Sequence, residues 1–426
     1  MSCDLVIHGA NEVFAVGETD VEVIEDGAVA IDDGVMVAAG EEDDVLGQYP
    51  VEDAEVKIDA SGKTVLPGFV DPHTHAVFSG DRSDEFEAKI EGKSYQEIAE
   101  EGGGIGSTVD ATRDAGGDEL LSNLLNRLDR MLEYGSTTVE VKSGYGLDVE
   151  TELRLLEVIE EADARHPVDV LPTYMGAHAV PPGTDVERYV DDVVENQLPD
   201  VGDQGIAVFC DVFCEKGYFD VEESRRILEA GMEYGLEPKV HADELSRLGG
   251  AELAAELGAV SADHLLHATE EDAEAMADNG VTPVLLPGTA FSLDAEYVDP
   301  EVFYDAGCDI AVATDFNPNC HSHSMSFAVT LSCVEMGMTV EDALVAATRN
   351  ASRALDRHDR GLLAEGKPAD IQVVDAPNHV HVPYSFGVNL VETVVKDGKI
   401  VYRSDSVLDD EDGGKHVERS SRGGDV

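Results

Sequence analysis

The chain has 426 residues, and its 90 Asp and Glu residues against 28 Lys and Arg give a formal charge of −62. So acidic a chain lacks the basic footprint of a nucleic-acid-binding protein and suits a salty cytoplasm, where salt screens the repulsion between surface charges. Hydrophobic residues make up 42% of the sequence, which excludes a disordered chain and predicts a large core.

The N-terminus and the cysteines set further limits. The first residues have no basic flank before an apolar core, so we expect no signal peptide. No apolar run reaches about 18 residues, the length of a membrane span. Six cysteines are too few for a disulfide scaffold. We therefore expect a cytoplasmic protein that does not enter a membrane.

Both ends of the chain carry short β patterns bounded by Gly and Asp. We expect residues 1–63 and 361–408 to build one small composite β-sandwich, with no helix in the first sixty residues. Asp397-Gly398 is a hairpin turn signal. Residues 409–426 are polar, charged and rich in Gly and Ser, which predicts a flexible acidic tail. The predicted strands are 5–7, 21–24, 28–31, 35–39, 370–374 and 391–396.

Residues 64–360 alternate between strand and helix patterns. Eight strands separated by amphipathic helices predict an α/β protein with a parallel sheet, and eight strands close a (β/α)8 TIM barrel. The long first connection is expected to hold extra helices over the site. The predicted strands are 64–70, 137–141, 168–173, 206–213, 237–241, 260–264, 282–286 and 309–314, and the clearest helices are 150–164, 222–234, 251–257 and 271–279.

Histidine and aspartate follow several of these strands. His73 and His75 alternate along one strand end, so both side chains can point to the same side. His241 and Asp315 end two other strands, and the carboxyl ends of barrel strands meet at one mouth. Three imidazole nitrogens and one carboxylate oxygen suit Zn²⁺ or Fe²⁺, so these four residues predict a catalytic metal site. The alternative for Asp315 is a helix cap, but Asn317-Pro318 follows too closely for a helix to begin.

Other polar residues at strand ends are expected to face the pocket without binding the metal. His264 is expected to polarise a carbonyl or hold the attacking water. Glu244 lies three residues after His241, where a carboxylate can accept hydrogen bonds from substrate N–H groups and shuttle a proton; a solvated loop acid is the alternative. Lys142 is expected to pair with a neighbouring acid, and the three glycines at 102–104 to form a mobile lid loop.

Together these residues resemble the amidohydrolase superfamily, whose pattern is His-x-His after strand one, His after strands five and six, and Asp after strand eight. Residues 361–371 are also similar to that superfamily's return to its β-sandwich. The resemblance implies a metal-dependent hydrolase. Some members bridge two metals with a carboxylated lysine after strand four, whereas this strand ends in Phe213-Cys214-Glu215. One divalent metal ion is therefore expected.

Within the superfamily, most of residues 1–405 resemble the enzymes that open the ring of 4-imidazolone-5-propanoate with water, giving N-formimidoyl-L-glutamate in histidine breakdown. The segments that carry this resemblance are 78–82, 102–105, 141–147, 175–178, 241–244 and 315–318.

That resemblance assigns roles to single residues. Asp315, His264 and Glu244 would be catalytic. Arg82 would bind the propanoate carboxylate, which its planar fork matches. The further substrate contacts would be Tyr145, His178 and Asn317. Many relatives have Gly and then Ser or Thr where this chain has Asn319 and Cys320, so the contacts of those two positions do not carry over directly.

Two other functions stay open. A deaminase of a cyclic amidine or pyrimidine would share His241-x-x-Glu244, but a neutral base needs no guanidinium, so Arg82 discriminates between them. A non-catalytic barrel scaffold would purify without stoichiometric metal. The sequence does not separate Zn²⁺ from Fe²⁺, and a homodimer is expected only because it is the commonest assembly.

The charge of −62 predicts salt dependence. The Debye length grows from about 3 Å at 1 M salt to about 30 Å at 0.01 M, so repulsion among surface carboxylates is no longer screened at low salt. We expect the protein to lose structure during dialysis into low salt, measured by far-UV circular dichroism. A spectrum that does not change over this range would contradict the expectation.

Overall fold

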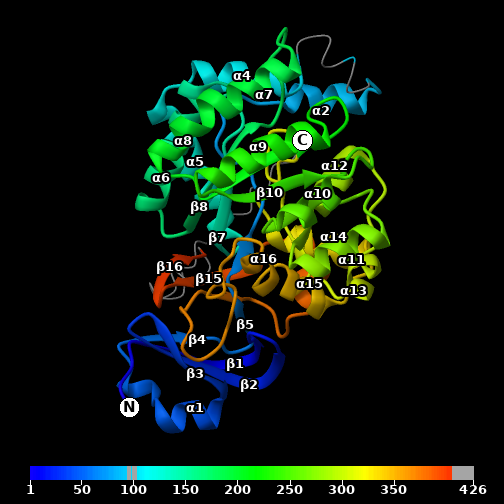
Figure 1. Ribbon diagram of the computed structural model, residues 1–426. Coiled ribbons are helices and arrows are strands. Elements are labelled where there is room, and N and C mark those ends of the chain that lie inside the picture. Colours follow the sequence, from blue (N-terminus) through cyan, green and yellow to red (C-terminus); the bar gives the residue numbers. More distant parts are fainter. Residues whose placement is uncertain (94–96, 98–102, 405–426) are drawn as a thin grey trace, which may run out of the picture.

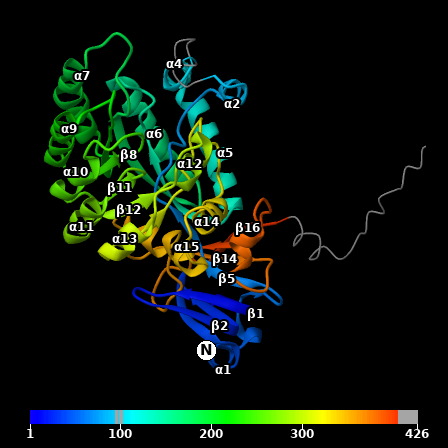
Figure 2. The same ribbon diagram turned by 90° about the vertical axis from the view of Figure 1, so that its right-hand side faces the viewer.

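The computed structural model describes residues 1–93, 97 and 103–404. They form an eight-stranded parallel barrel and a separate eight-stranded sheet that lies beyond one end of the barrel (Figures 1 and 2). The predicted α/β fold is thus confirmed. None of the helices in these ranges combines the length and apolarity needed to cross a bilayer. The tail predicted at 409–426 lies outside the described residues.

The barrel strands follow one another around the sheet in chain order. The last and first strands are joined by a parallel bridge between Thr74 and Phe316. Asp71 strengthens this seam, because its carboxylate accepts hydrogen bonds from the backbone N–H and the hydroxyl of Thr314 at 3.1 and 2.6 Å. The carboxyl ends of the strands therefore surround one mouth. The strands are β6 (Phe69–Asp71), β7 (Ser136–Lys142), β8 (Asp169–Ala177), β9 (Phe209–Cys214), β10 (Glu237–Ala242), β11 (Ser261–His264), β12 (Thr282–Leu285) and β13 (Ala311–Val312).

Several helices begin at a residue whose side chain caps them. Asp148 accepts a hydrogen bond from the Thr151 backbone at the start of α6, and Asp220 forms a capping box with Glu223 at the start of α9. Apolar faces then pack α6 and α9 on the strands. The predicted helices correspond to α6 (Val149–Arg165), α9 (Val221–Glu233), α10 (Gly250–Leu257) and α11 (Glu270–Asn279).

The long first connection does hold extra helices, α2 (Ser83–Ile90), α4 (Ile105–Asp114) and α5 (Gly117–Glu133). In both views α2 and α4 lie at the end of the barrel remote from the second sheet (Figures 1 and 2). Of the glycines predicted to form a lid, Gly102 lies outside the described residues and Gly104 directly precedes α4. The remaining barrel helices are α7 (Val186–Asp192), a π-helix (Val193–Gln197), α8 (Leu198–Gln204), α12 (Pro287–Leu293), α13 (Glu301–Ala306), α14 (Met325–Val334), α15 (Val340–Ala346) and α16 (Arg349–Arg353).

The second sheet is assembled from both ends of the chain, as predicted. Its order is β16-β15-β14-β5-β1-β2-β3, with β4 beside β1. Leu5 and Ile31 share a buried cluster with Ile371 and Val395, so the two ends pack on a common core. Its elements are β1 (Leu5–Val16), β2 (Val21–Asp32), β3 (Val35–Glu41), β4 (Val56–Asp59), β5 (Thr64–Pro67), β14 (Ile371–Val374), β15 (Val391–Lys396) and β16 (Lys399–Arg403); a 3-10 turn (Val51–Asp53) precedes β4, and α17 (His381–Tyr384) follows β14.

Two expectations for the N-terminal region were wrong. A helix, α1 (Glu42–Gln48), interrupts the first sixty residues, and the acids in its first turn stabilise its N-terminus. Val45 is its one buried residue, so the sequence shows no apolar helix pattern there. The strand predicted at 64–70 is two strands, because β5 pairs in the second sheet while β6 begins the barrel. Gly68 separates them, and a Cβ there would lie 2.4 Å from the Thr137 side chain.

Candidate active site

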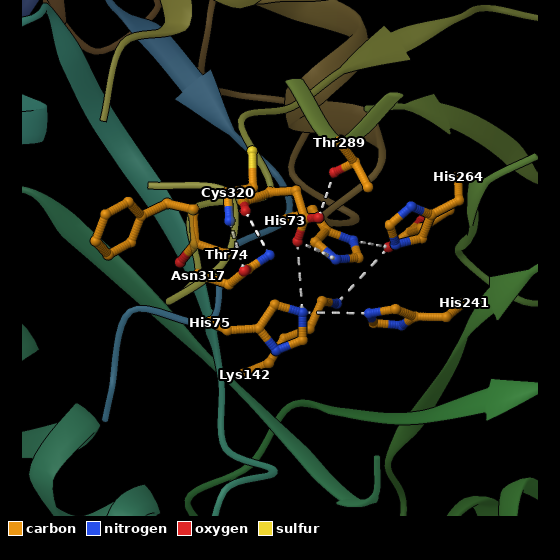
Figure 3. A network of polar contacts seen from close by, with 12 residues as sticks. His73, Thr74, His75, Lys142, His241, His264, Thr289, Asn317 and Cys320 are labelled. Atoms are coloured by element: carbon orange, nitrogen blue, oxygen red, sulfur yellow. Dashed lines mark hydrogen bonds and ion pairs between the residues drawn. The ribbon is translucent and has the colours of Figure 1, made fainter. Parts of the chain in front are cut away.

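Five polar side chains face one another at the mouth of the barrel (Figure 3): His73, His75, His241, His264 and Asp315. His75 Nε2 lies 3.3 Å from His241 Nε2. Asp315 Oδ1 lies 3.6 Å from His73 Nε2 and 3.7 Å from His75 Nε2. Around a tetrahedral metal with bonds of about 2.1 Å, neighbouring ligand atoms are about 3.4 Å apart. The spacing of the four predicted ligands therefore fits a single cation.

The protonation and burial of these atoms also fit a metal. His73 Nε2 and Asp315 Oδ1 are buried and have no hydrogen-bond partner among the described residues. Burial holds the pKa of His73 and of His75 well below the usual range, so both imidazoles are neutral and keep a free lone pair. Burial raises the pKa of Asp315, whose negative charge a cation would compensate. The cluster is a candidate divalent-metal site.

Two carboxylates contact the imidazoles of the candidate ligands from the side away from the cluster. Asp263 Oδ2 lies 2.6 Å from His73 Nδ1, and Asp211 Oδ2 lies 3.0 Å from His241 Nδ1. A carboxylate at Nδ1 keeps the proton on that nitrogen and leaves Nε2 as the free ligand atom. Both carboxylates are fully buried, so they orient the rings without contact with solvent.

Two buried lysines neutralise part of this negative charge. Lys142 Nζ lies 2.7 Å from Asp211 Oδ2 and 2.8 Å from Glu140 Oε1, which confirms that Lys142 pairs with neighbouring acids. Lys239 Nζ lies 3.1 Å from Glu140 Oε2. These two ammonium groups pair with three carboxylates, those of Glu140, Asp211 and Asp263. Asp315, beside His73, is a fourth carboxylate of the cluster, so a divalent cation would balance the formal excess of two negative charges.

The loop after β7 forms one wall of the pocket. His178 stacks on His75 with ring centroids 4.8 Å apart, and its Nδ1 lies 3.1 Å from the Gly144 carbonyl oxygen. Gly144 has a φ of +94°, and a Cβ there would lie 3.0 Å from the His178 ring, so only glycine fits. Tyr145 lies 5.2 Å from His178 between ring centroids. Glu152, buried in α6, fixes this loop by accepting three backbone hydrogen bonds, from Gly144, Gly146 and Leu147.

The opposite wall carries the expected acid–base groups. His264 has a φ of +78° and Asp315 a φ of +50°, an uncommon backbone conformation that aims both side chains into the pocket. His264 Nε2 lies 3.7 Å from Glu244 Oε2. Burial and the nearby Asp315 raise the pKa of Glu244 to about 8, so this carboxyl can carry a proton near neutral pH. Thr289 donates a hydrogen bond to Asp315 Oδ2, which leaves Oδ1 toward the cluster.

The residues expected to bind substrate at the outer rim already have partners. The Arg82 guanidinium donates to Glu85 Oε2 at 2.9 and 2.6 Å. Asn319 accepts a hydrogen bond from Lys89, a cation that sequence reasoning had missed. Asn317 Oδ1 accepts the backbone N–H groups of residues 319 and 320 and so shapes the loop. Cys320 is buried, and its thiol points to the Thr314 carbonyl oxygen at 3.6 Å.

Sequence reasoning also missed the residues that support the ligands. Asp211 is the one charged residue in the otherwise apolar strand β9, and Lys239 is a fully buried position of β10; a charge inside a buried strand was the available signal. Asp263 directly precedes His264 in β11, and sequence reasoning considered only the histidine. Thr289 and Glu152 had no distinguishing pattern, because their roles depend on contacts between distant segments.

Solved structures with little sequence similarity share the fold. An adenosine deaminase from Xanthomonas campestris with bound zinc matches with a TM-score of 0.73 at 17% identity, over 96% of this chain and 97% of that chain. The ochratoxinase of A. niger matches with a TM-score of 0.70 at 18% identity, over 95% and 97%. These likenesses concern the fold alone.

The barrel, its composite sheet and the site at the strand ends define a class of hydrolases: the chain belongs to the Amidohydrolase family, which matches residues 81–402. Three relatives narrow the class. A protein of Haloarcula marismortui named imidazolonepropionase is 61% identical over 402 residues, covering 93% of this chain and 96% of that protein. Those of Halobacterium salinarum (58% over 409 residues; 94% and 98%) and Geobacillus kaustophilus (47% over 394 residues; 91% and 93%) carry the same name. Within the class, the chain belongs to the imidazolonepropionases.

The buried lysine predicts a measurable effect on metal binding. Substituting Lys142→Met leaves Asp211 with less charge compensation, so Asp211 holds the His241 ring less firmly. We expect metal affinity to fall about 10- to 100-fold, measured by competition with a chromogenic chelator. Lys216→Met, at an exposed lysine, is the matched control. Unchanged affinity in Lys142→Met protein with a native circular dichroism spectrum would contradict the role; Lys239→Met provides a second test if the first variant does not fold.

Proposed function

We propose that this protein is a metal-dependent hydrolase that adds water across the cyclic amide of 4-imidazolone-5-propanoate and releases N-formimidoyl-L-glutamate in histidine degradation. The observation that carries the proposal is the 61% identity, over 93% of this chain, to a protein named imidazolonepropionase. The convergence of His73, His75, His241 and Asp315 supplies a fitting site for the reaction.

A single Zn²⁺ or Fe²⁺ bound by those four residues would lower the pKa of a coordinated water toward about 7 and polarise the substrate carbonyl. One ion is favoured over two because β9 ends in Phe213 and Cys214, followed by Glu215, with no lysine to bridge a second. The buried lysines, Lys142 and Lys239, are bound to carboxylates in the barrel interior.

Side chains held in place by the surrounding barrel would carry out the acid–base steps. Asp315 takes the proton from the attacking water and passes it to the leaving ring nitrogen; its other oxygen is held by Thr289. His264 stands across the pocket, donates to the developing oxyanion and stabilises its charge. Glu244 faces the N–H side of the ring, and its raised pKa suits a group that exchanges protons with a ring nitrogen near neutral pH.

Substrate recognition would come from the walls of the pocket. Arg82 binds the propanoate carboxylate, which replaces Glu85 as its anionic partner. Tyr145 and His178, on the wall opposite Glu244, contact the carboxylate or the ring. The remaining contacts proposed are Asn317, Asn319 and Cys320. The Asn319 side chain is bound to Lys89, the Cys320 thiol is turned away, and the backbone N–H groups of both residues donate to Asn317 Oδ1, so substrate would have to replace one of these contacts.

The proposal includes a cytoplasmic location and a homodimer. Six cysteines, all free in the structure, support a reducing compartment. Two-fold dimers are the commonest assembly of soluble enzymes, and sedimentation velocity would distinguish dimer from monomer.

The activity can be tested directly. Purified protein mixed with synthetic 4-imidazolone-5-propanoate should remove its ultraviolet absorbance. A chelator should abolish the reaction until Zn²⁺ or Fe²⁺ is restored, because no side chain of the cluster can take the place of the ion. Protein that purifies without stoichiometric metal and is indifferent to chelation would instead support a non-catalytic scaffold.

Arg82 separates the proposed hydrolase from a deaminase. Arg82→Met removes the charged hydrogen bonds to the propanoate, so we expect KM to rise about 10- to 100-fold with little change in kcat. Arg188→Met, at an exposed arginine, is the control and should match the unmodified enzyme. A KM that is unchanged in Arg82→Met would favour a neutral substrate, as for a deaminase of a cyclic amidine or pyrimidine.

A further inference from the structure

A second pocket lies at the opposite end of the barrel from the metal cluster. Its volume is about 260 Å³. Arg349 and Arg353 extend from α16, close to the amino end of β13, where Arg353 pairs with Asp309. Figure 1 shows α16 on the side of the barrel that faces the second sheet. We call this the basic pocket; it is lined by Arg349, Arg353, Arg357, His358, Arg360, Leu362, Lys367 and Glu18.

The charge of the basic pocket is opposite to that of the rest of the protein. It is lined by five of the 28 Lys and Arg residues of the chain but by only one of the 90 Asp and Glu residues. Elsewhere acids outnumber bases. Three of the five cations pair with carboxylates, Arg353 with Asp309, Arg360 with Asp169 and Lys367 with Glu18. The two remaining arginines, Arg349 and Arg357, add positive charge that a further anion would compensate.

Part of that positive charge has no carboxylate partner. Arg349 Nη1 donates only to backbone carbonyl oxygens, of Gly17 at 3.2 Å and Asp20 at 3.5 Å. Arg357 is exposed, and its guanidinium forms no ion pair or hydrogen bond with any of the described residues. By contrast, Arg360 is bound to Asp169 at 2.7 Å and forms part of the wall. Arg349 and Arg357 are therefore available to bind an anion.

Glu18 is the carboxylate among the residues that line the basic pocket. Its side chain is 67% exposed and forms an ion pair with Lys367 at 2.5 Å. The hydrogen bond from Lys367 lowers the pKa of Glu18. The backbone carbonyl oxygen of Glu18 accepts a hydrogen bond from Arg353. Glu18 sits on the short turn between β1 and β2, so its side chain can turn outward and free Lys367.

We propose that the basic pocket binds the phosphate group of a small molecule, with Arg349, Arg357 and Lys367 as its ligands and Glu18 as the resident carboxylate that it displaces. Arginine forks match the oxygens of phosphate, and the pocket has room for more than one phosphate group. Because α16 belongs to the barrel and the turn at Glu18 to the second sheet, the bound anion bridges the two parts. It stabilises their junction and leaves the chemistry at the far end unchanged.

The proposal is tested with two probes, inorganic phosphate and ATP, on the metal-loaded enzyme. Titrations are run at constant ionic strength in about 0.5 M KCl, where long-range repulsion from the acidic surface is screened. Binding is followed by calorimetry and by the thermal midpoint. We expect Arg357→Gln to weaken binding about fivefold and Glu18→Gln to strengthen it by a similar factor, with kcat unchanged in both. Arg188→Gln is the control.

The outcomes separate the possible sources of the effect. Equal affinity for both probes identifies the phosphate group alone as sufficient, and tighter binding of ATP identifies a nucleotide. Phosphate bound at the metal cluster, or a general salt effect, would be insensitive to Arg357→Gln and Glu18→Gln. That insensitivity, or the absence of binding to either probe, would overturn the proposal. None of these results bears on the hydrolase activity.

Discussion

The buried ion pairs of Lys142 and Lys239 are the interactions on which the site depends. Removing two ammonium groups and their carboxylates from water costs several kcal/mol for each ion, and the attraction between them recovers this only with close partners. Such a network is weak evidence for stability. Its value lies in placement, because Asp211 and Asp263 cannot orient His241 and His73 unless their own charges are held inside the barrel.

Carboxylates perform a second structural task in this protein. Glu152 accepts three backbone N–H groups of the loop that carries Tyr145, and Asp243 accepts those that open α10, of Leu248, Gly249 and Ala251. Asp71 ties the first barrel strand to Thr314 in the same way. Most acids of this chain are on the surface, yet these few fix the loops from which the pocket is built.

The sequence predicted the parts of the site that depend on chain-local patterns. His73 and His75 alternate within one strand end, and the ends of parallel barrel strands meet, so the residue order alone indicated the candidate ligands. It did not indicate the supporting layer. Asp263 lies 190 positions from His73 along the chain, and only the closed barrel brings them to 2.6 Å. Helix α1 was missed because it buries only Val45 and so leaves no periodic signal, and the break at Gly68 was missed because it depends on Thr137, a residue of the next barrel strand.

The seam between β6 and β13 gives the metal site a further property. His73 and His75 follow the first strand and Asp315 follows the last, so one ion bound by them would connect the two edges of the sheet. Among the described residues these edges are joined by the bridge of Thr74 with Phe316 and by the hydrogen bonds of Asp71 with Thr314. Loss of the ion would weaken ring closure as well as chemistry. Metal binding and the free energy of unfolding are then thermodynamically linked. In a cell short of the metal, the protein would be less stable and more readily degraded as well as inactive.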